Sequence, residues 1–303
     1  MWQRRQFLRS LCVFSVPLWR PALALETSDV LIERTIVSTG QRIPVIGMGS
    51  WLTFDCANDP HALRIRVEVL RQFFAHGGAV IDSSPMYGSS EQALGYCLSE
   101  LEDPKLFSAT KVWTYGRGFG ERQMAKSARL WGLESFDLMQ VHNLLDVEKH
   151  LETLTAWKES GRVGYIGATT SHGRRHDDLL SLMERGVLDF VQFTYNMMDR
   201  EAEQRLLPMA SERGIAVIVN RPFRRSRVFD RVRGTVLPNW AAEFDCKNWA
   251  QFFLKFVVSH PAVACAIPAT SRVDHMVENM GALRGRLPDP AMRRRMAAYF
   301  DQL

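Results

Sequence analysis

Four side chains that can exchange protons lie at or just beyond the ends of three successive apolar segments of the chain. The side chains are Asp82, Tyr87, Lys111 and His142, and the segments are 79–81, 106–110 and 136–141. Short apolar segments that alternate with helical patterns indicate parallel strands, whose carboxyl ends meet at one face of the fold. We therefore expect the four side chains to surround a single pocket.

An acid, a phenol, an amine and an imidazole can together protonate and polarise a carbonyl oxygen. The phenol of Tyr87 is a poor acid near neutral pH, because the unperturbed pKa of tyrosine is about 10. A nearby ammonium favours the phenolate, so Lys111 is expected to lower the pKa of Tyr87, while Asp82 keeps the amine charged. His142 is expected to donate to the carbonyl oxygen. With a hydride source, the group would reduce a carbonyl compound.

Eight apolar segments alternate with helical patterns from residue 44 to the end of the chain. The expected strands are 44–49, 79–81, 106–110, 136–141, 165–168, 189–193, 216–219 and 263–267. The expected helices are 61–75, 90–98, 122–133, 147–159, 176–185, 199–213, 249–259 and one that starts near 274. The composition is uniform and no linker interrupts it. This pattern predicts an α/β fold with a single (β/α)8 barrel, or TIM barrel, over residues 25–303.

Segment 32–43 reads as a β-hairpin ahead of the barrel, and Ser90 as a cap for the second helix. An open, doubly wound sheet is the alternative architecture. That fold favours a glycine-rich turn after the first strand, and segment 47–52 lacks the third glycine of such a turn.

The first 24 residues have the composition of an export signal. Paired Arg4 and Arg5 precede an apolar stretch over 11–19 and the small-x-small sequence at 22–24. This segment resembles a twin-arginine signal peptide, which predicts export machinery as a partner and a periplasmic or otherwise exported protein. A cytoplasmic location follows if the signal is false, and an uncleaved anchor is a further alternative. The apolar stretch is shorter than the roughly 20 residues that span a bilayer, so we expect no stable membrane span in the mature chain.

The net charge of +5 comes almost entirely from this leader. Without its four arginines, the 38 Lys and Arg side chains fall to 34, beside 33 Asp and Glu. The remaining chain is close to neutral, so the high pI does not indicate a nucleic-acid partner. The five cysteines show no metal-binding spacing, and their positions do not decide whether any of them pair.

Several motifs resemble those of the aldo/keto reductase family, in matching order, over about residues 32–283. They are IPVIGMGSW, IDSSPMYGSSE, the strand end at Lys111, FDLMQVHN and AIPATSRVDHMVENMGA. The resemblance implies an NAD(P)H-dependent enzyme that reduces a small-molecule aldehyde or ketone. In it Tyr87 is the proton donor, Lys111 and Asp82 tune its pKa, and His142 orients the substrate. It also implies NADPH (NADP) bound at the barrel mouth, with NAD as an alternative cofactor. From the residues themselves we expect no metal.

The predicted cofactor-binding residues come from several strand ends. They are Ser50, Trp51, Thr169, Thr170, Gln192, Asn220, Arg221, Ser271, Arg272, His275 and Asn279. The last four follow the final strand, where hydroxyl, guanidinium and helix amide groups suit a 2′-phosphate and an adenine.

Three positions depart from the family pattern. The usual Ser-Asn pair that holds the nicotinamide carboxamide is Thr169-Thr170. The usual stacking aromatic is Asn220, and the basic residue of many members is Ala269. These departures put cofactor affinity and NADP preference in doubt, and they leave Arg272 as the expected phosphate partner.

Other readings of the sequence remain open. A barrel with altered carboxamide and stacking positions suits a redox-sensing or binding subunit with little turnover. Lys111 suits a Schiff-base lyase that needs no nucleotide.

The arginines between 221 and 233 indicate either a pyrophosphate site or a solvated basic face. His172, His176 and Asp177 have a spacing that a metal can use on a helix, although Gly173 interrupts it.

Overall fold

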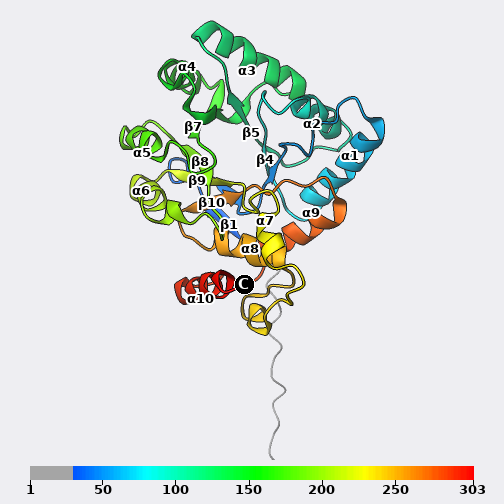
Figure 1. Ribbon diagram of the computed structural model, residues 1–303. Coiled ribbons are helices and arrows are strands. Elements are labelled where there is room, and N and C mark those ends of the chain that lie inside the picture. Colours follow the sequence, from blue (N-terminus) through cyan, green and yellow to red (C-terminus); the bar gives the residue numbers. More distant parts are fainter. Residues whose placement is uncertain (1–29) are drawn as a thin grey trace, which may run out of the picture.

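The computed structural model describes residues 30–303 and shows eight parallel strands closed into a barrel (Figure 1). The strands are β3 (Met48–Gly49), β4 (Val80–Asp82), β5 (Phe107–Val112), β6 (Phe136–Val141), β7 (Val163–Thr169), β8 (Phe190–Thr194), β9 (Ala216–Asn220) and β10 (Val263–Ala266). They pair in chain order, and a parallel bridge between Ile46 and Ala266 closes the ring. The predicted (β/α)8 barrel is therefore confirmed, and the open sheet is excluded.

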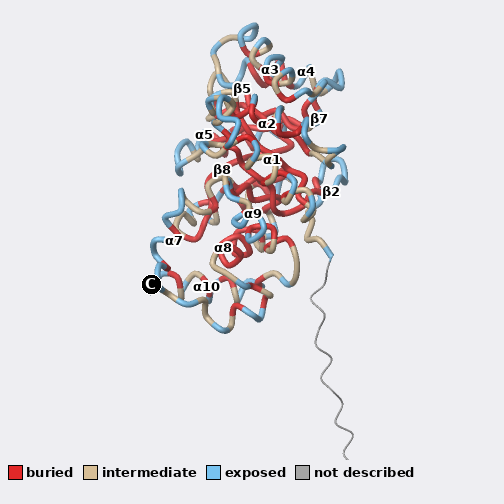
Figure 2. Tube along the Cα trace, turned by 90° about the vertical axis from the view of Figure 1, so that its right-hand side faces the viewer, coloured by how far each residue is buried: buried red, intermediate tan, exposed pale blue. Residues whose placement is uncertain are grey.

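Helices surround the barrel and bury their apolar sides against it, so the buried residues run through the centre of the molecule (Figure 2). The principal helices are α1 (Pro60–Ala75), α2 (Ser90–Ser99), α3 (Arg117–Trp131), α4 (Val147–Glu159), α5 (His176–Glu184), α6 (Leu206–Arg213), α8 (Trp249–Val258) and α9 (Val273–Met280). Because each helix returns the chain to the start of the next parallel strand, the carboxyl ends of all eight strands meet at one mouth of the barrel.

A small hairpin closes the opposite end of the barrel. Its strands are β1 (Glu33–Thr35) and β2 (Arg42–Pro44), which confirms the predicted hairpin. Ile36 and Ile43 pack into a cluster with aromatic side chains from the amino ends of the barrel strands. The Tyr165 hydroxyl also donates to Gln41 at 2.7 Å. Within residues 30–303 the hairpin covers this end of the barrel, and the carboxyl ends of the strands form the opposite mouth.

The structure corrects the sequence prediction in several places. The helix expected over 122–133 begins at Arg117, and only Met48–Gly49 of the strand expected over 44–49 forms a barrel strand. The helix expected over 199–213 is a short 3-10 turn, Glu201–Glu203, followed by α6. Ser90 is the first helical residue rather than a cap, and its hydroxyl donates to the Ser50 carbonyl at 3.4 Å. Sequence reasoning missed α7 (Arg227–Arg231) and α10 (Pro290–Asp301).

The final helix α10 has a clear start signal in the sequence. The Asp289 side chain accepts from the Met292 amide at 2.7 Å, and Pro290 occupies the first helical position. Buried Arg293 then anchors the helix through the Tyr195 hydroxyl and Glu203. Three consecutive arginines, 293–295, interrupt the apolar residues of this helix and obscure its apolar face.

The predicted signal peptide, residues 1–24, lies outside the described residues. From residue 30 onward, none of the helices is both long and apolar enough to cross a bilayer. The four cysteines of this part of the chain are free thiols: Cys56, Cys97, Cys246 and Cys265.

Candidate active site

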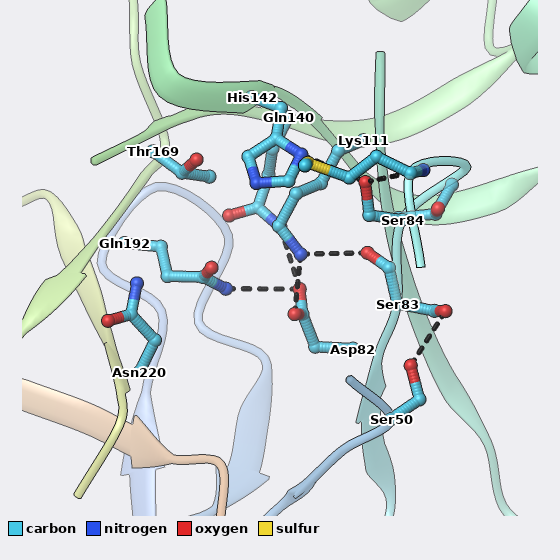
Figure 3. Close-up of polar contacts among 12 residues, drawn as sticks. Ser50, Asp82, Ser83, Ser84, Lys111, Gln140, His142, Thr169, Gln192 and Asn220 are labelled. Carbon is cyan, nitrogen blue, oxygen red and sulfur yellow. Dashed lines mark hydrogen bonds and ion pairs between the residues drawn. The ribbon is translucent and has the colours of Figure 1, made fainter. Parts of the chain in front are cut away.

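A buried ion pair forms the floor of the barrel mouth. Lys111, near the end of β5, has no exposed surface, and its Nζ donates to Asp82 Oδ2 at 2.5 Å and to the Ser83 carbonyl at 2.7 Å. The other carboxylate oxygen of Asp82 accepts from Gln140 and Gln192, each at 3.0 Å. Figure 3 shows the Gln192 amide directed at this carboxylate. Both charges are thus compensated, as buried charges require.

The loop between β4 and α2 places Tyr87 above this pair. The Lys111 Nζ lies 5.3 Å from the centroid of the Tyr87 ring. Gly88, next in sequence, has φ +60°, and a Cβ there would meet the Asp55 carboxylate at 2.4 Å. The glycine allows Asp55 to approach and to accept from the Ser89 amide and hydroxyl, both at 2.8 Å. The loop is therefore held at a fixed distance from the ion pair.

The electrostatics of Tyr87 differ from the sequence prediction. Burial raises the pKa of the Tyr87 phenol, and the Asp82 carboxylate raises this pKa further. The expected acidification by Lys111 is wrong for the free protein, because Asp82 already balances the ammonium charge at contact distance. Tyr87 is therefore a neutral phenol that holds its proton.

His142 stands beside the phenol as a neutral imidazole. Its ring centroid lies 5.7 Å from that of Tyr87, with the two planes nearly perpendicular at 87°. Burial, followed by the charge of Lys111, lowers the pKa of His142 to about 2. Its Nδ1 and the Ser84 hydroxyl are 2.9 Å apart. When Ser84 donates to Nδ1, the ring proton resides on Nε2, where it can be offered to a ligand.

A cavity of about 480 Å³ opens above these groups. It brings together many of the residues predicted from sequence, from both the catalytic and the cofactor sets. These are Ser50, Trp51, Asp82, Tyr87, His142, Thr169, Thr170, Gln192, Asn220 and Arg221. Lys111 lies beneath the cavity and contacts Asp82. Ser271, Arg272, His275 and Asn279 are not part of its lining.

The side of the cavity formed by β7, β8 and β9 carries unused hydrogen-bonding capacity. The Thr170 Oγ1 atom is buried and has no partner within residues 30–303. Asn220 is already engaged, since its Nδ2 donates to the Thr170 carbonyl at 2.9 Å and its Oδ1 accepts from Thr194 at 2.7 Å. A carboxamide placed here can hydrogen-bond to the orphaned hydroxyl of Thr170.

Positive charge collects at the rim of the cavity. The Arg225 guanidinium lies 4.3 Å from the centroid of the Trp51 ring, and Arg221 contacts the His172 imidazole. Neither arginine has a carboxylate partner in the part of the chain that the structure describes, whereas Arg224 pairs with Asp199 at 3.2 Å. The rim therefore suits an anionic group.

The histidines near the rim do not form a metal site. Asp177, grouped with them in the sequence, is exposed and pairs with Arg205 at 2.6 Å. His172 contacts Arg221, and His176 lies 3.6 Å from Glu201. Across residues 30–303, no three His, Cys, Asp or Glu side chains are grouped so as to hold a metal ion.

Arg272, the residue predicted to bind the 2′-phosphate, already forms an ion pair. Its guanidinium forms a two-pronged ion pair with exposed Asp274. His275 is also exposed, while Asn279 is buried in α9. On α1, Arg66 donates to the Ser271 carbonyl at 2.9 Å and so ties this loop to the first helix.

Two polar residues of the site and one buried acid beside it were missed in the sequence. Gln140 holds Asp82, Ser84 contacts His142, and Glu91 is buried at the start of α2. A polar residue inside the apolar strand 136–141 and an acid within the amphipathic segment 90–98 were the available signals.

Comparisons with known proteins agree with this geometry. A sequence profile described as the aldo/keto reductase family matches residues 45–298. The chain is 22% identical over 302 residues to "Probable aldo-keto reductase 1" of Glycine max, with 84% of this chain and 85% of that protein covered. It is 23% identical over 249 residues to the "NADH-specific methylglyoxal reductase" of Escherichia coli K12, with 72% of each covered. The fold superposes on an aldo/keto reductase from Klebsiella pneumoniae in complex with NADP and acetate, with TM-score 0.75, 22% identity, and 88% and 94% of the chains covered.

The protonation state of Tyr87 can be measured without a ligand. We expect the ultraviolet difference spectrum between the wild type and Tyr87→Phe to show no tyrosinate absorbance at about 295 nm between about pH 8 and pH 11. Burial and Asp82 raise the pKa, so the phenolate forms only above this range. A single tyrosinate that appears in the wild type below about pH 9 would mean that Lys111 dominates, contrary to the structure.

Proposed function

Because this chain belongs to the aldo/keto reductase family, we propose that it is an NADPH-dependent oxidoreductase that reduces an aldehyde or ketone to an alcohol. The observation that supports this most directly is the arrangement of four groups at one pocket. Neutral Tyr87 and neutral His142 border the cavity, and the Lys111–Asp82 pair lies beneath them.

Each group has a role that its environment supports. In reduction, a hydride adds to the carbonyl carbon while Tyr87 gives its phenolic proton to the oxygen, which yields the alcohol and a phenolate. A high pKa suits this donor, because the phenol must hold its proton until negative charge develops on the substrate oxygen. The ammonium of Lys111 then stabilises the phenolate until solvent reprotonates it. His142 donates from Nε2 and orients the carbonyl.

The cavity also has the groups that a nicotinamide dinucleotide needs. Such a cofactor supplies the hydride when it is bound. Thr170 and Gln192 offer hydrogen bonds to the carboxamide, and Arg221 and Arg225 offer charge to the pyrophosphate. Arg272 offers charge to a 2′-phosphate. NADP is present in the similar Klebsiella pneumoniae structure, and the similar Escherichia coli protein is named as NADH-specific, so NAD is the alternative cofactor.

The two alternative functions receive different support. A Schiff-base lyase needs an accessible amine, whereas the Lys111 amine is fully buried and donates to Asp82 and the Ser83 carbonyl. A redox-sensing or binding barrel remains consistent with the engaged Asn220 amide, which takes the place of a stacking aromatic. Turnover separates this alternative from the reductase.

Steady consumption of NADPH with a panel of aldehydes and ketones tests the reductase proposal. We expect Tyr87→Phe to lower kcat by roughly 10²- to 10⁴-fold, because it removes the proton donor and leaves the nucleotide contacts intact. The matched control is Tyr96→Phe, which changes an exposed tyrosine on α2 and should leave kcat unchanged. Nucleotide binding without turnover by the wild type would favour the sensing alternative.

The role of Arg272 can be measured by nucleotide titration of tryptophan fluorescence. We expect Arg272→Ala to weaken NADPH by roughly 10- to 100-fold and to leave NADH unchanged, since only NADPH carries the 2′-phosphate. Asp274→Asn should tighten NADPH because it frees the guanidinium. Arg64→Ala, an exposed arginine on α1, is the control. Equal losses for both nucleotides would remove Arg272 from the phosphate role.

We also propose that residues 1–24 direct export and are removed after Ala24. The mature protein recovered from a bacterial periplasm should then begin at Leu25 by mass spectrometry. Arg4→Lys with Arg5→Lys should keep the protein in the cytoplasm, whereas Arg9→Lys with Arg20→Lys preserves the paired arginines and should not. Export of the first double variant at the wild-type level would contradict a twin-arginine signal.

A further inference from the structure

Glu91 is a buried carboxylate that none of the roles above uses. It is the second residue of α2 and is only 3% exposed. Its Oε1 accepts from the Thr110 hydroxyl at 2.6 Å, and its Oε2 accepts from the Ser127 hydroxyl at 2.8 Å. Among residues 30–303 no cation lies within ion-pair distance of it. The carboxylate therefore links α2, β5 and α3 through two hydroxyl groups.

Stability alone gives no reason for a charge at this position. Burial raises the pKa of Glu91, whereas the hydrogen bonds from Thr110 and Ser127 and the charge of Lys111 oppose this shift and favour the ionised form, which carries a desolvation penalty. A glutamine offers Thr110 the same acceptor and can donate its amide to Ser127, without the cost of the charge. The negative charge itself is therefore the feature to explain.

Thr110, which Glu91 contacts, and Ser90, which precedes it in the chain, both lie next to the proposed catalytic groups. Thr110 precedes Lys111 on β5, and because side chains alternate along a strand, Thr110 faces the helices while Lys111 faces the barrel interior. On the other side, the first helical amide of α2, from Ser90, donates to the Tyr87 carbonyl at 3.1 Å. Glu91 thus ties the strand that carries the ammonium to the helix that follows the phenol.

The charge of Glu91 also acts on Lys111 across the strand. Burial lowers the pKa of Lys111, and the nearby carboxylates of Asp82 and Glu91 both oppose this shift. The groups around the ammonium are Asp82 on β4, Tyr87 in the loop before α2, Glu91 on α2 and His142 after β6. Tyr87 and His142 are neutral, so the two carboxylates, together with the Ser83 carbonyl that accepts from the ammonium at 2.7 Å, favour the protonated amine. The Asp82 carboxylate also accepts hydrogen bonds from the amides of Gln140 and Gln192.

We propose that Glu91 is a positioning residue that fixes the spacing between Lys111 and Tyr87 and, as a second carboxylate, keeps Lys111 charged at alkaline pH. The inference rests on the proposed reductase function and deepens it. The Glu91 side chain would make two separate contributions, one through its hydrogen bonds and one through its charge. The hydrogen bonds set the geometry, and the charge sets the upper pH limit of activity.

Glu91→Gln removes the charge and retains the hydrogen bonds. The test measures kcat and KM against pH for the aldehyde that the wild type reduces fastest, together with the unfolding temperature. We expect the alkaline limb of kcat to move down by about one pH unit, because loss of a nearby negative charge lowers the pKa of Lys111. KM should not change, since Glu91 does not line the cavity. The unfolding temperature should stay the same or rise.

Glu91→Ala and Asp137→Asn serve as comparisons. The alanine variant loses both hydrogen bonds, so its kcat should fall at every pH and its unfolding temperature should drop. Asp137 holds the other end of β5 by accepting from the Ser108 amide and hydroxyl at 2.7 and 2.8 Å. Its conversion to asparagine removes a charge beside the same strand and should leave the alkaline limb in place.

A readout that needs no turnover keeps the inference distinct from the reductase assignment. The ¹³Cε chemical shift of Lys111 in labelled protein reports its titration directly, and Lys111→Met identifies the signal. In Glu91→Gln this titration should move to lower pH. An unchanged Lys111 titration, or equal shifts in Glu91→Gln and Asp137→Asn, would overturn the role of Glu91. A wild type that binds NADPH but reduces no carbonyl compound would overturn the reductase assignment alone.

Discussion

The ion pair between Lys111 and Asp82 is the constraint on which the site depends. Both groups are almost fully buried inside the barrel, and a 2.5 Å contact joins them. Removal of either partner would leave an uncompensated charge in a low-dielectric interior, at a cost of about 3–5 kcal/mol. The barrel supplies the rest of the compensation from two strands that do not pair with β4, through Gln140 on β6 and Gln192 on β8. The pair therefore couples the catalytic floor to the closure of the barrel.

The ion pair also decides how Tyr87 behaves. The sequence shows which side chains share a pocket, but it does not show how strongly two opposite charges cancel each other. Lys111 is close to the phenol, yet its charge is balanced at contact distance, so burial and Asp82 dominate the pKa of Tyr87. In the proposed reaction, the ammonium becomes important only after the proton has left, when the phenolate needs a counter-charge.

The residues at the strand ends could be predicted from the sequence, because all strands of a parallel barrel end at the same face. Three of these apolar segments end at or near a polar residue at the same face of the barrel, so the sequence alone places Asp82, Lys111 and His142 around one pocket. Contacts between residues on opposite sides of a strand lack such a rule. Glu91 reaches Thr110 from a helix, and nothing in the local pattern specifies that approach. Helix α10 was missed for a related reason, since its buried anchor Arg293 binds Tyr195 and Glu203, which are distant in the sequence.

Charge is distributed unevenly between the floor and the rim of the cavity. The floor is electrically balanced, with a paired ammonium, a neutral phenol and a neutral imidazole. The rim carries Arg221 and Arg225, and neither has a carboxylate partner within residues 30–303. An anionic dinucleotide would therefore gain its charge-dependent affinity at the rim, and its reacting end would meet hydrogen-bonding groups of no net charge. Charge-dependent affinity and proton transfer are then governed by separate residues, so a change at Arg221 or Arg225 can alter the binding of an anion and leave the Lys111–Asp82 pair and Tyr87 unchanged.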